Sequence, residues 1–268
     1  MSLEIVRPDS VRAAAAILAG DSSARFLAGG TLVVRAWNSG DVSIRRLVLA
    51  DGLGLDTIRV GAGRAELGAA VTMARVLATP ELKFLHPVAR EIGGPAIRAM
   101  ATVGGNLFAP YPFGDFSAAL LALDAEVNVE SAEGAETLAL EDFLPRRDRG
   151  SPIVRGVAFD TPAEGAFRFA KVVRRHPHGA PVLSIAAHLP VTDGRVGGAR
   201  VAYGAMAPTA MRAKAVEHAL EGRPLDGATI AAAAKVAGEG CAPASDPQAS
   251  AWYRRAVLSV HLARLLQA

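Results

Sequence analysis

Two glycine pairs in the first half of this 268-residue chain could hold a phosphate group. The first lies in Ala28-Gly29-Gly30-Thr31, directly after an expected strand, and the second lies in Thr102-Val103-Gly104-Gly105-Asn106. Consecutive glycines present backbone N–H groups with no Cβ in the way, and such amides can bind phosphate without a lysine. Two loops of this kind that face each other would suit a pyrophosphate, and therefore a dinucleotide. Either pair taken alone is more often a tight turn.

Lys171 is a second candidate for chemistry. Residues 166–173 alternate in character, which places Lys171 on the same strand face as Phe167 and Phe169. An ammonium group among aromatic side chains is costly unless an anionic or electron-rich partner lies against it. We interpret Lys171 as a residue that tunes a bound cofactor; the alternative is a surface lysine on an edge strand.

Several other functions lack the residues they require. The single cysteine, Cys241, cannot close an intrachain disulfide or supply the thiolates of an iron–sulfur cluster. Neither a Gly-x-Ser-x-Gly elbow nor a P-loop Gly-Lys-Ser/Thr occurs, and Gly61-Ala62-Gly63 lacks the third glycine of a Rossmann fingerprint. His176 and His178 have no third ligand nearby, and the arginines before them favour a solvated loop over a metal site.

The composition indicates a folded chain without a strongly charged partner. Hydrophobic residues make up 51% and charged residues 21%, and the net charge is only +3. The basic run at residues 146–149 is interrupted by an acid and lacks interleaved aromatic residues, so we predict a solvated loop and no nucleic-acid binding. No apolar run reaches the length of a membrane span or a signal peptide, so we expect a cytoplasmic protein without a membrane span.

The elements that position these residues are short strands and helices without strict alternation. Helices are expected over residues 11–19, from 73 to the residue before Pro80, and over 87–91, 116–123, 211–220, 229–237 and 251–266. Strands are expected over 25–28, 44–50, 126–130 and 166–173, and hairpins over 58–71 and around 192–195. The polar stretch 133–155 is interpreted as the edge of a first domain. The predicted fold class is therefore α+β.

These motifs resemble the FAD-binding, medium subunit of the molybdenum hydroxylases, the family of xanthine dehydrogenase and carbon monoxide dehydrogenase. Residues 28–34, AGGTLVV, are similar to the family's first flavin loop, AGGTDLL, and residues 97–106, IRAMATVGGN, are similar to its second, IRNxATIGGN. As in the family, an aspartate, Asp115, follows nine residues after Asn106. Residues 169–175, 202–213 and 253–255 resemble its lysine-bearing strand, its C-terminal-domain signature and the start of its last helix.

The resemblance implies a two-part FAD-binding domain of the vanillyl-alcohol-oxidase-like, PCMH type over residues 1–160, with subdomains of about 1–55 and 56–160. A smaller α+β C-terminal domain of sheet plus helices would follow over 161–268. The implied function is electron transfer, from iron–sulfur clusters of a partner through FAD to an external acceptor such as NAD, oxygen or a quinone. The implied partners are a large molybdopterin-binding subunit and a small iron–sulfur subunit, in a heterotrimer or its dimer; they alone would carry the molybdenum cofactor and the clusters.

The family's motifs also imply the flavin contacts, residue by residue. Backbone groups of the two loops would bind the pyrophosphate and the ribityl chain, and Asn106 would add an amide donor. Asp115 would accept a hydrogen bond from a flavin hydroxyl, or alternatively cap a helix, and Lys171 would stabilise reduced, anionic flavin. Ile92 would pack at the cofactor, and the backbone of Ile153 would lie against the adenine. The predicted cofactor-binding residues are Leu27, Ala28, Gly29, Gly30, Thr31, Leu32, Ile92, Thr102, Val103, Gly104, Gly105, Asn106, Asp115, Ile153 and Lys171. No catalytic residue and no metal ligand is expected on this chain.

The chain departs from the family pattern at a few positions. Leu32 stands where the first loop usually has an aspartate, and Ala99 stands in place of the asparagine of the second motif. Aromatic residues, Phe108, Tyr111 and Phe113, replace the usual small residues before Asp115, which we interpret as a changed wall near the flavin. Two alternatives stay open: a stand-alone flavin-dependent oxidoreductase, and a scaffold subunit that has lost its flavin.

Overall fold

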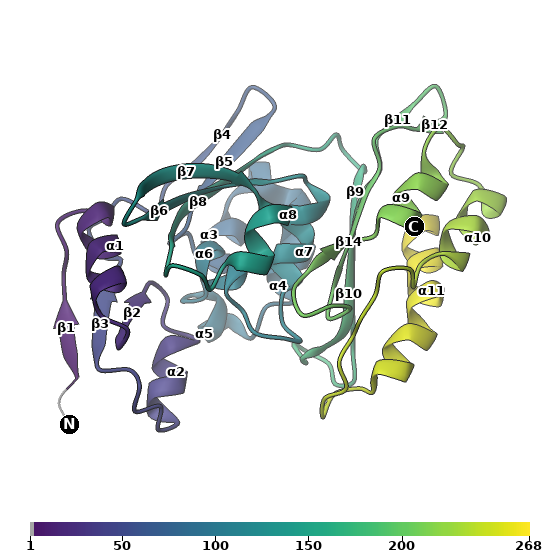
Figure 1. Cartoon of the computed structure of the whole chain (residues 1–268). Helices are drawn as coiled ribbons and strands as arrows, with labels where there is room; N and C mark the ends of the chain where they lie inside the picture. Colours follow the sequence, from purple (N-terminus) through teal and green to yellow (C-terminus); the bar gives the residue numbers. More distant parts are fainter. Residues whose placement is uncertain (1–2) are drawn as a thin grey trace.

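The computed structural model describes residues 3–268, in which three main β-sheets follow one another from the amino to the carboxyl end (Figure 1). We describe the chain in the three parts expected from the sequence: a first part up to residue 55, a second part from 56 to 160, and a third part from 161 onward.

The first part is a small parallel sheet covered by one helix. It contains β1 (Glu4–Val6), α1 (Val11–Gly20), β2 (Ala24–Leu27), α2 (Val33–Asn38) and β3 (Arg46–Leu49). The strands lie in the order β1-β3-β2, and α1 buries Ala14, Ala15 and Leu18 in a core of its own. The predicted helix at residues 11–19 is confirmed by α1. The Ser10 side chain caps this helix by accepting a hydrogen bond from the Ala13 N–H.

The second part is a five-stranded antiparallel sheet with helices packed against it. Its strands are β4 (Ile58–Gly61), β5 (Arg64–Gly68), β6 (Glu126–Ser131), β7 (Gly134–Ala139) and β8 (Ile153–Asp160), in the order β4-β5-β8-β6-β7. Its helices are α3 (Met73–Ala78), the 3-10 helix η1 (Pro80–Leu85), α4 (His86–Arg90), α5 (Pro95–Arg98), α6 (Val103–Leu107), α7 (Asp115–Ala122), α8 (Leu140–Phe143) and the 3-10 helix η2 (Leu144–Arg146).

Two predictions for the second part meet different outcomes. The hairpin expected over residues 58–71 is confirmed by β4 and β5, and the Thr72 side chain caps α3, which follows it. The stretch 133–155, interpreted as the edge of the first domain, forms β7 and α8 and enters β8. Since β8 pairs with both β5 and β6, it lies in the middle of the sheet.

The third part is a four-stranded antiparallel sheet with one face covered by helices. Its elements are β9 (Phe167–Val173), β10 (Pro181–His188), β11 (Val191–Thr192), β12 (Arg195–Val196), β13 (Arg200–Gly204), β14 (Met211–Arg212), α9 (Lys214–Leu220), α10 (Gly227–Lys235) and α11 (Ala251–Gln267). The main sheet has the order β14-β13-β10-β9, and β11 and β12 form the predicted hairpin at residues 192–195. The helix expected over 211–220 begins only at Lys214, because Met211 and Arg212 pair with Tyr203 and Ala202 as a strand.

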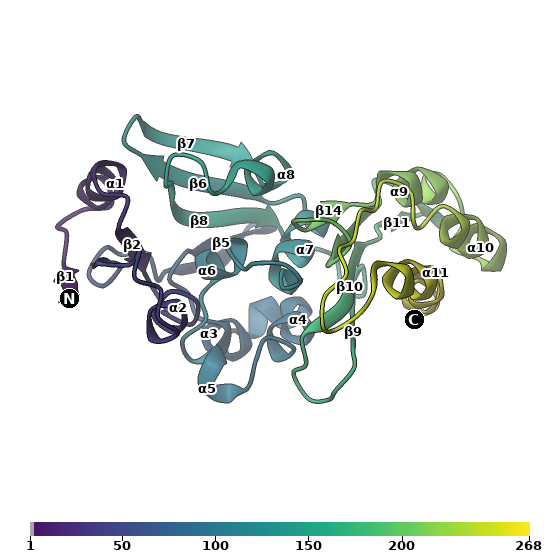
Figure 2. The same cartoon turned by 60° about the horizontal axis from the view of Figure 1, so that its bottom comes forward.

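The four-stranded sheet separates two hydrophobic cores. Figure 2 shows β9 and β10 nearly edge-on, with α4 and α7 on one side and α9, α10 and α11 on the other. Phe167 and Phe169 of β9 pack against the core of the second part, while Ala170 and Val172 pack against the core of the third. The predicted alternation in β9 is therefore confirmed, and it directs Lys171 toward the second part.

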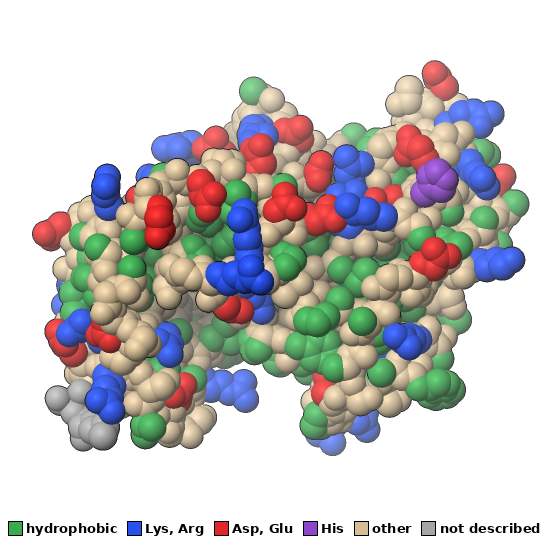
Figure 3. Space-filling model, in the orientation of Figure 1, with side chains coloured by type: hydrophobic (Ala, Val, Ile, Leu, Met, Phe, Trp, Pro, Cys, Tyr) green, Lys and Arg blue, Asp and Glu red, His purple; other side chains and the backbone are tan. Residues whose placement is uncertain are grey.

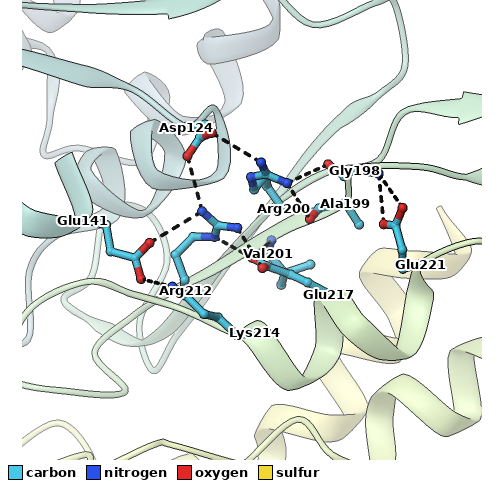
Figure 4. Close-up of polar contacts among 10 residues, drawn as sticks. All are labelled: Asp124, Glu141, Gly198, Ala199, Arg200, Val201, Arg212, Lys214, Glu217 and Glu221. Atoms are coloured by element: carbon cyan, nitrogen blue, oxygen red, sulfur yellow. Dashed lines mark hydrogen bonds and ion pairs between the residues drawn. The ribbon is translucent and has the colours of Figure 1, made fainter. Parts of the chain in front are cut away.

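Helix α7 lies where the second and third parts meet. Each of its residues from Asp115 to Ala122 is buried, and the helix contacts both β10 and β13. A charged network joins the two parts beyond its carboxyl end (Figure 4). There Arg212 pairs with Glu217 at 2.5 Å and lies 3.4 Å from Asp124, and Lys214 pairs with Glu141 at 2.7 Å.

The overall fold is α+β, as predicted. No helix within residues 3–268 is long and apolar enough to span a membrane. Figure 3 shows basic and acidic side chains intermixed along the upper part of one face, over β7, α8 and α9, with neither sign predominating. This mixed pattern agrees with the small net charge of +3.

Candidate cofactor site

The two glycine loops lie in contact with each other. The first joins β2 to α2, and the second consists of Thr102, which caps α6, and the first four residues of that helix. A Cβ on Gly29 would lie 1.7 Å from the carbonyl oxygen of Met100 and 3.2 Å from Cγ2 of Thr102. Such a distance is impossible for a real side chain, so only glycine at position 29 permits this close approach. The structure thus brings the two glycine segments into contact, the arrangement that would suit a pyrophosphate.

The first loop offers backbone N–H groups that the chain itself does not use. Within residues 3–268, the N–H groups of Gly29, Gly30, Thr31 and Leu32 form no hydrogen bond with another group of the chain. Gly30 has φ +72°, in the left-handed region that glycine adopts most easily, and the chain turns there into α2. A run of unpaired amides around a left-handed glycine is suited to an anionic oxygen such as that of a phosphate.

The second loop differs, because its amides already have partners. The N–H groups of Val103 and Gly104 donate to the carbonyl oxygens of Val71 and Ala69, each at 2.8 Å, and Gly105 N–H donates to Thr102 Oγ1 at 3.1 Å. These bonds hold α6 against the segment that follows β5. A Cβ on Gly104 would lie 2.8 Å from Ala69 Cβ, so this glycine serves close packing.

Asn106 is anchored within the second loop. Its Nδ2 donates to the carbonyl oxygen of Thr102 at 2.8 Å, and its own carbonyl oxygen accepts from Ser117 Oγ at 3.3 Å. The first of these bonds uses one of the two amide hydrogens predicted to reach the cofactor, and one remains. The second joins the loop to the first turn of α7.

Lys171 and Asp115, both predicted from the sequence, form a buried ion pair with each other. Lys171 Nζ lies 2.8 Å from Asp115 Oδ2, and the two side chains are 4% and 5% exposed. Lys171 Nζ also donates to the carbonyl oxygen of Glu91 at 2.8 Å. Lys171 is on an edge strand, but the alternative of a surface lysine is wrong because its side chain is buried. The alternative of Asp115 as a helix cap is also wrong, because Gly114 occupies the cap position of α7 without a side-chain bond.

Asp115 retains one oxygen for a ligand. Its Oδ1 is buried and has no hydrogen-bond partner within the described chain. A buried carboxylate oxygen without a donor is costly, so it is suited to a hydroxyl group. FAD requires N–H donors for its pyrophosphate and can satisfy an acceptor with its hydroxyl groups. The first loop and Asp115 Oδ1 supply these two needs, so the residues present fit this cofactor.

The two predicted isoleucines are placed differently. Ile92 is half-buried against the core of the second part and follows Glu91, whose carbonyl oxygen holds Lys171. Ile153 is only 1% exposed and packs in the core beneath α1. The structure therefore brings Ile92 beside the ion pair, whereas Ile153 lies at the start of β8, opposite Glu130 of β6. Leu27 and Ala28 end β2 and lead into the first loop.

The aromatic substitutions before Asp115 are mostly turned into the protein. Phe108 packs edge-to-face on Phe143 with the ring centroids 6.0 Å apart. The Tyr111 hydroxyl donates to the carbonyl oxygen of Ala244 at 2.8 Å, and the Tyr111 ring centroid lies 5.3 Å from Cζ of Arg254. Only Phe113 is exposed, at 44%. Of the three aromatic residues, Tyr111 contacts the third part and Phe108 packs within the second.

Sequence reasoning missed the buried arginine under Tyr111. Arg254 has 0% exposure, pairs with Asp246 at 2.7 Å and donates to the carbonyl oxygens of Pro181 and Val182. The available signal was helical spacing, since Arg254 lies four and eight residues before the buried Leu258 and Leu262. These contacts fix the segment before Asp115 against the start of β10.

Arg147 is also buried, so the prediction of a solvated loop over residues 146–149 is wrong at this position. Its side chain donates to the carbonyl oxygens of Leu107, at 2.5 Å, and Ala109, at 3.0 Å, which lie at the carboxyl end of α6. Burial lowers the pKa of Arg147 below its ordinary value. Its neighbours Arg146 and Asp148 are exposed, as expected.

Other candidate sites lie apart from the glycine loops. His176 is exposed, and no group of three or more potential metal ligands is found within residues 3–268. A cavity of about 530 Å³ lies between the loop after β3 and the five-stranded sheet, lined in part by Leu55, Asn128, Thr137 and Arg155. It contains none of the predicted cofactor residues, and we assign the site by its donors and acceptors instead.

Comparison with known proteins agrees with this geometry. Residues 1–155 match a family profile described as the FAD binding domain in molybdopterin dehydrogenase, and residues 168–268 match the CO dehydrogenase flavoprotein C-terminal domain. The chain is 26% identical over 267 residues to the glyceraldehyde dehydrogenase medium chain of Sulfolobus acidocaldarius, covering 95% of this chain and 94% of that protein. It is 30% identical to the nicotinate dehydrogenase FAD-subunit of Eubacterium barkeri, over 77% of this chain and 75% of that protein.

The structural comparison covers the whole chain. Carbon monoxide dehydrogenase from Hydrogenophaga pseudoflava superposes with a TM-score of 0.91 at 25% identity, covering 100% of this chain and 97% of that one. The first profile alone spans more than half of the chain. This protein therefore belongs to the FAD-binding medium subunits of the molybdenum hydroxylase family, and it is an oxidoreductase subunit whose cofactor is FAD.

Proposed function

We propose that this chain is the electron-transfer subunit of a heteromeric molybdenum hydroxylase. The proposal rests on the first glycine loop. Its backbone N–H groups at residues 29–32 have no partner in the described chain, and Gly29 lies against the second loop. The chain also belongs to a family that binds FAD. When bound, FAD accepts electrons from iron–sulfur clusters and passes them to an external acceptor. The work of this chain is to bind and orient the cofactor and to set the charge around it.

The two loops divide this work in the proposal. The amides of Gly29 to Leu32 bind the pyrophosphate, because they are the ones without partners in the chain. The second loop shapes the opposite wall and offers its one remaining Asn106 amide hydrogen. Asp115 Oδ1 accepts a hydrogen bond from a hydroxyl group of the cofactor, and Ile92 packs beside it. The proposed contacts also retain Leu27, Ala28, Thr102, Val103, Gly104, Gly105 and Ile153 as family positions.

The Lys171–Asp115 pair sets the charge at the site. Lys171 brings a positive charge that favours the electron-rich cofactor, and Asp115 offsets part of it. Because the pair is held away from water, each charge acts through a low local dielectric and has more effect than a surface charge. Removing either partner should therefore change the reduction potential of the bound cofactor, with opposite signs.

The partners follow from the same family position. Relatives named above are a medium chain and an FAD-subunit, and the similar solved structure is a carbon monoxide dehydrogenase. This chain has one cysteine, Cys241, which is buried, so it cannot hold an iron–sulfur cluster. We propose a small iron–sulfur subunit as the electron donor and a large molybdopterin-binding subunit as the site of substrate oxidation.

The test begins with purification of the chain together with its associated subunits and measurement of its visible spectrum. We expect a flavin spectrum and the release of FAD on denaturation; a complex without flavin at micromolar protein would refute the proposal and favour a scaffold. Turnover of a small substrate by the isolated chain would instead favour a stand-alone oxidoreductase. For the loaded protein, Lys171→Met should lower the potential and Asp115→Asn should raise it. Each tenfold change in the relative binding of the two redox states is roughly 30 mV for two electrons.

A further inference from the structure

A row of residues across the four-stranded sheet faces the amino end of α7. Lys171 of β9 lies directly opposite Ser184 of β10, which lies opposite Gly204 of β13. Lys171 reaches from this row to Asp115, the first residue of α7. At the other end of the row, a Cβ on Gly204 would lie 3.7 Å from the carbonyl oxygen of Gly114. Ser184, in the middle, therefore lies beside the start of this helix.

The Ser184 hydroxyl is buried and has no partner of its own. Ser184 is 0% exposed, and within the described chain its Oγ forms no hydrogen bond. The hydroxyl lies over Gly204, because a Cβ there would be 2.3 Å from it. Glycine at 204 leaves the space that the hydroxyl occupies. A buried hydroxyl costs free energy unless it is hydrogen-bonded, so a partner from outside the chain would stabilise the fold at Ser184.

The start of α7 supplies further unpaired groups at the same place. Asp115 Oδ1 is buried and unpartnered, and the N–H groups of Asp115, Phe116 and Ser117 make no hydrogen bond within residues 3–268. The first hydrogen bond of the helix is from Ala118 N–H to the carbonyl oxygen of Gly114. The unpaired hydroxyl on β10 and the unpaired donors and acceptor at the start of α7 thus lie on elements that pack against each other, and a water molecule can bridge groups of this kind.

We propose that Ser184 is a positioning residue that holds one buried water between its hydroxyl and Asp115 Oδ1. The water donates to the carboxylate and is itself held by Ser184 and by an amide of the first turn of α7. A carboxylate oxygen accepts two hydrogen bonds, so the water leaves room for the cofactor hydroxyl. By this means Ser184 fixes the orientation of the carboxylate that faces Lys171. The effect of Ser184 on the flavin rests on the proposed function, whereas the proposed water site does not depend on it.

The first test is a high-resolution crystal structure of the wild-type complex and of Ser184→Ala. We expect one ordered water within roughly 2.6–3.2 Å of Ser184 Oγ and Asp115 Oδ1 in the wild type, and its loss in the variant. Ser184→Ala should also lower the urea midpoint, because it breaks a completed hydrogen-bond network. If the Ser184 hydroxyl had no hydrogen-bond partner, Ser184→Ala would instead raise the urea midpoint, because removing an unsatisfied buried polar group stabilises the fold.

Tyr203→Phe is the matched control. Tyr203 is on the neighbouring strand, its hydroxyl is also buried without a partner, and it packs in the core of the third part, away from Asp115. In the flavin-loaded complex we expect Ser184→Ala to shift the potential to more negative values, because the carboxylate loses a donor, and Tyr203→Phe to leave it unchanged. The proposal is overturned if the wild type holds no water there, if the water persists in Ser184→Ala, or if the urea midpoint of that variant rises. Absence of flavin from all three proteins would refute the proposed function while leaving the crystallographic result decisive for the water.

Discussion

Lys171 Nζ and Asp115 Oδ2 are 2.8 Å apart in an ion pair that joins the C-terminal domain to the FAD-binding domain, with both side chains at most 5% exposed. Lys171 comes from β9 of the four-stranded sheet, and Asp115 is the first residue of α7. The pair is thus a contact between domains as well as a feature of the proposed flavin site.

The first prediction concerns the stability of this pair. Lys171→Met leaves a buried carboxylate without its cation and should destabilise the protein by about 3–5 kcal/mol. The double variant Lys171→Met/Asp115→Asn removes both charges and should cost clearly less than the sum of the single changes. Urea unfolding of the four proteins measures this cycle. Additive costs would mean that the two charges do not interact.

Gly29→Ala tests the contact of the two glycine loops. The new Cβ would meet the Met100 carbonyl at 1.7 Å, so the loops must separate. We expect loss of FAD binding and a destabilisation of about 1–3 kcal/mol, the usual cost of overpacking. Gly20→Ala is the control, because no atom lies within 4 Å of a Cβ there. Equal FAD affinity for both variants would contradict the proposed site.

Tyr111 and Arg254 test how the segment before Asp115 is held. Tyr111→Phe removes the hydrogen bond to Ala244 but keeps the ring over the guanidinium, so it should cost about 0.5–1.5 kcal/mol. Arg254→Met leaves Asp246 and two carbonyl groups without their donor and should cost about 3–5 kcal/mol. Thermal unfolding with matched buffers compares the two. A larger loss of stability for Tyr111→Phe than for Arg254→Met would contradict this prediction.

Asp246 gives a prediction about acid stability. Burial alone would raise the pKa of Asp246, but the backbone N–H groups of Ala249 and Gln248 and the Arg254 guanidinium outweigh it, so the pKa lies below its ordinary value. A depressed carboxyl pKa contributes stability above the unfolded value, roughly 3.9, that is lost as the pH falls through the folded pKa. Asp246→Asn should therefore be less stable than wild type at pH 7. The unfolding free energies of the wild type and Asp246→Asn should approach each other at acid pH. A difference that stays constant with pH would count against a lowered pKa of Asp246.

Cys241 should be an unreactive thiol. Burial raises its pKa to about 11, so the thiolate is scarce at neutral pH, and the thiol itself is only 8% exposed. We expect slow alkylation by iodoacetamide in the native protein and rapid alkylation in urea, followed as a mass shift. Because the chain has one cysteine, the reading is unambiguous. Rapid native labelling would show that this region opens.

The parts of the fold that could be predicted are those specified by local pattern. The alternation in β9, the hairpin at β4 and β5 and the helix at residues 11–19 each depend on neighbouring residues. The two glycine pairs were recognised as phosphate-binding candidates from local sequence, but the contact of Gly29 with Met100 was not predicted. Local pattern also assigned Met211 and Arg212 to a helix, but pairing with β13 made them a strand, because a sheet partner overrides helical propensity.

The parts that could not be predicted depend on partners distant in the chain. Lys171 and Asp115 were each expected to meet the flavin, but nothing in the sequence indicated that they pair with each other. The paired amides of Val103 and Gly104 likewise depend on acceptors in the segment after β5. Consequently the sequence could propose candidate residues for the site, whereas their hydrogen-bond partners came only from the fold.

The complete burial of α7 bears on how this protein could be divided. Its eight residues are covered partly by their own domain and partly by β10 and β13 of the next. Cutting the chain between β8 and β9 would expose an apolar helix on one fragment and one bare sheet face on the other. Each fragment should then aggregate when expressed alone and recover only on co-expression. In the intact chain the two domains should unfold together as one cooperative unit.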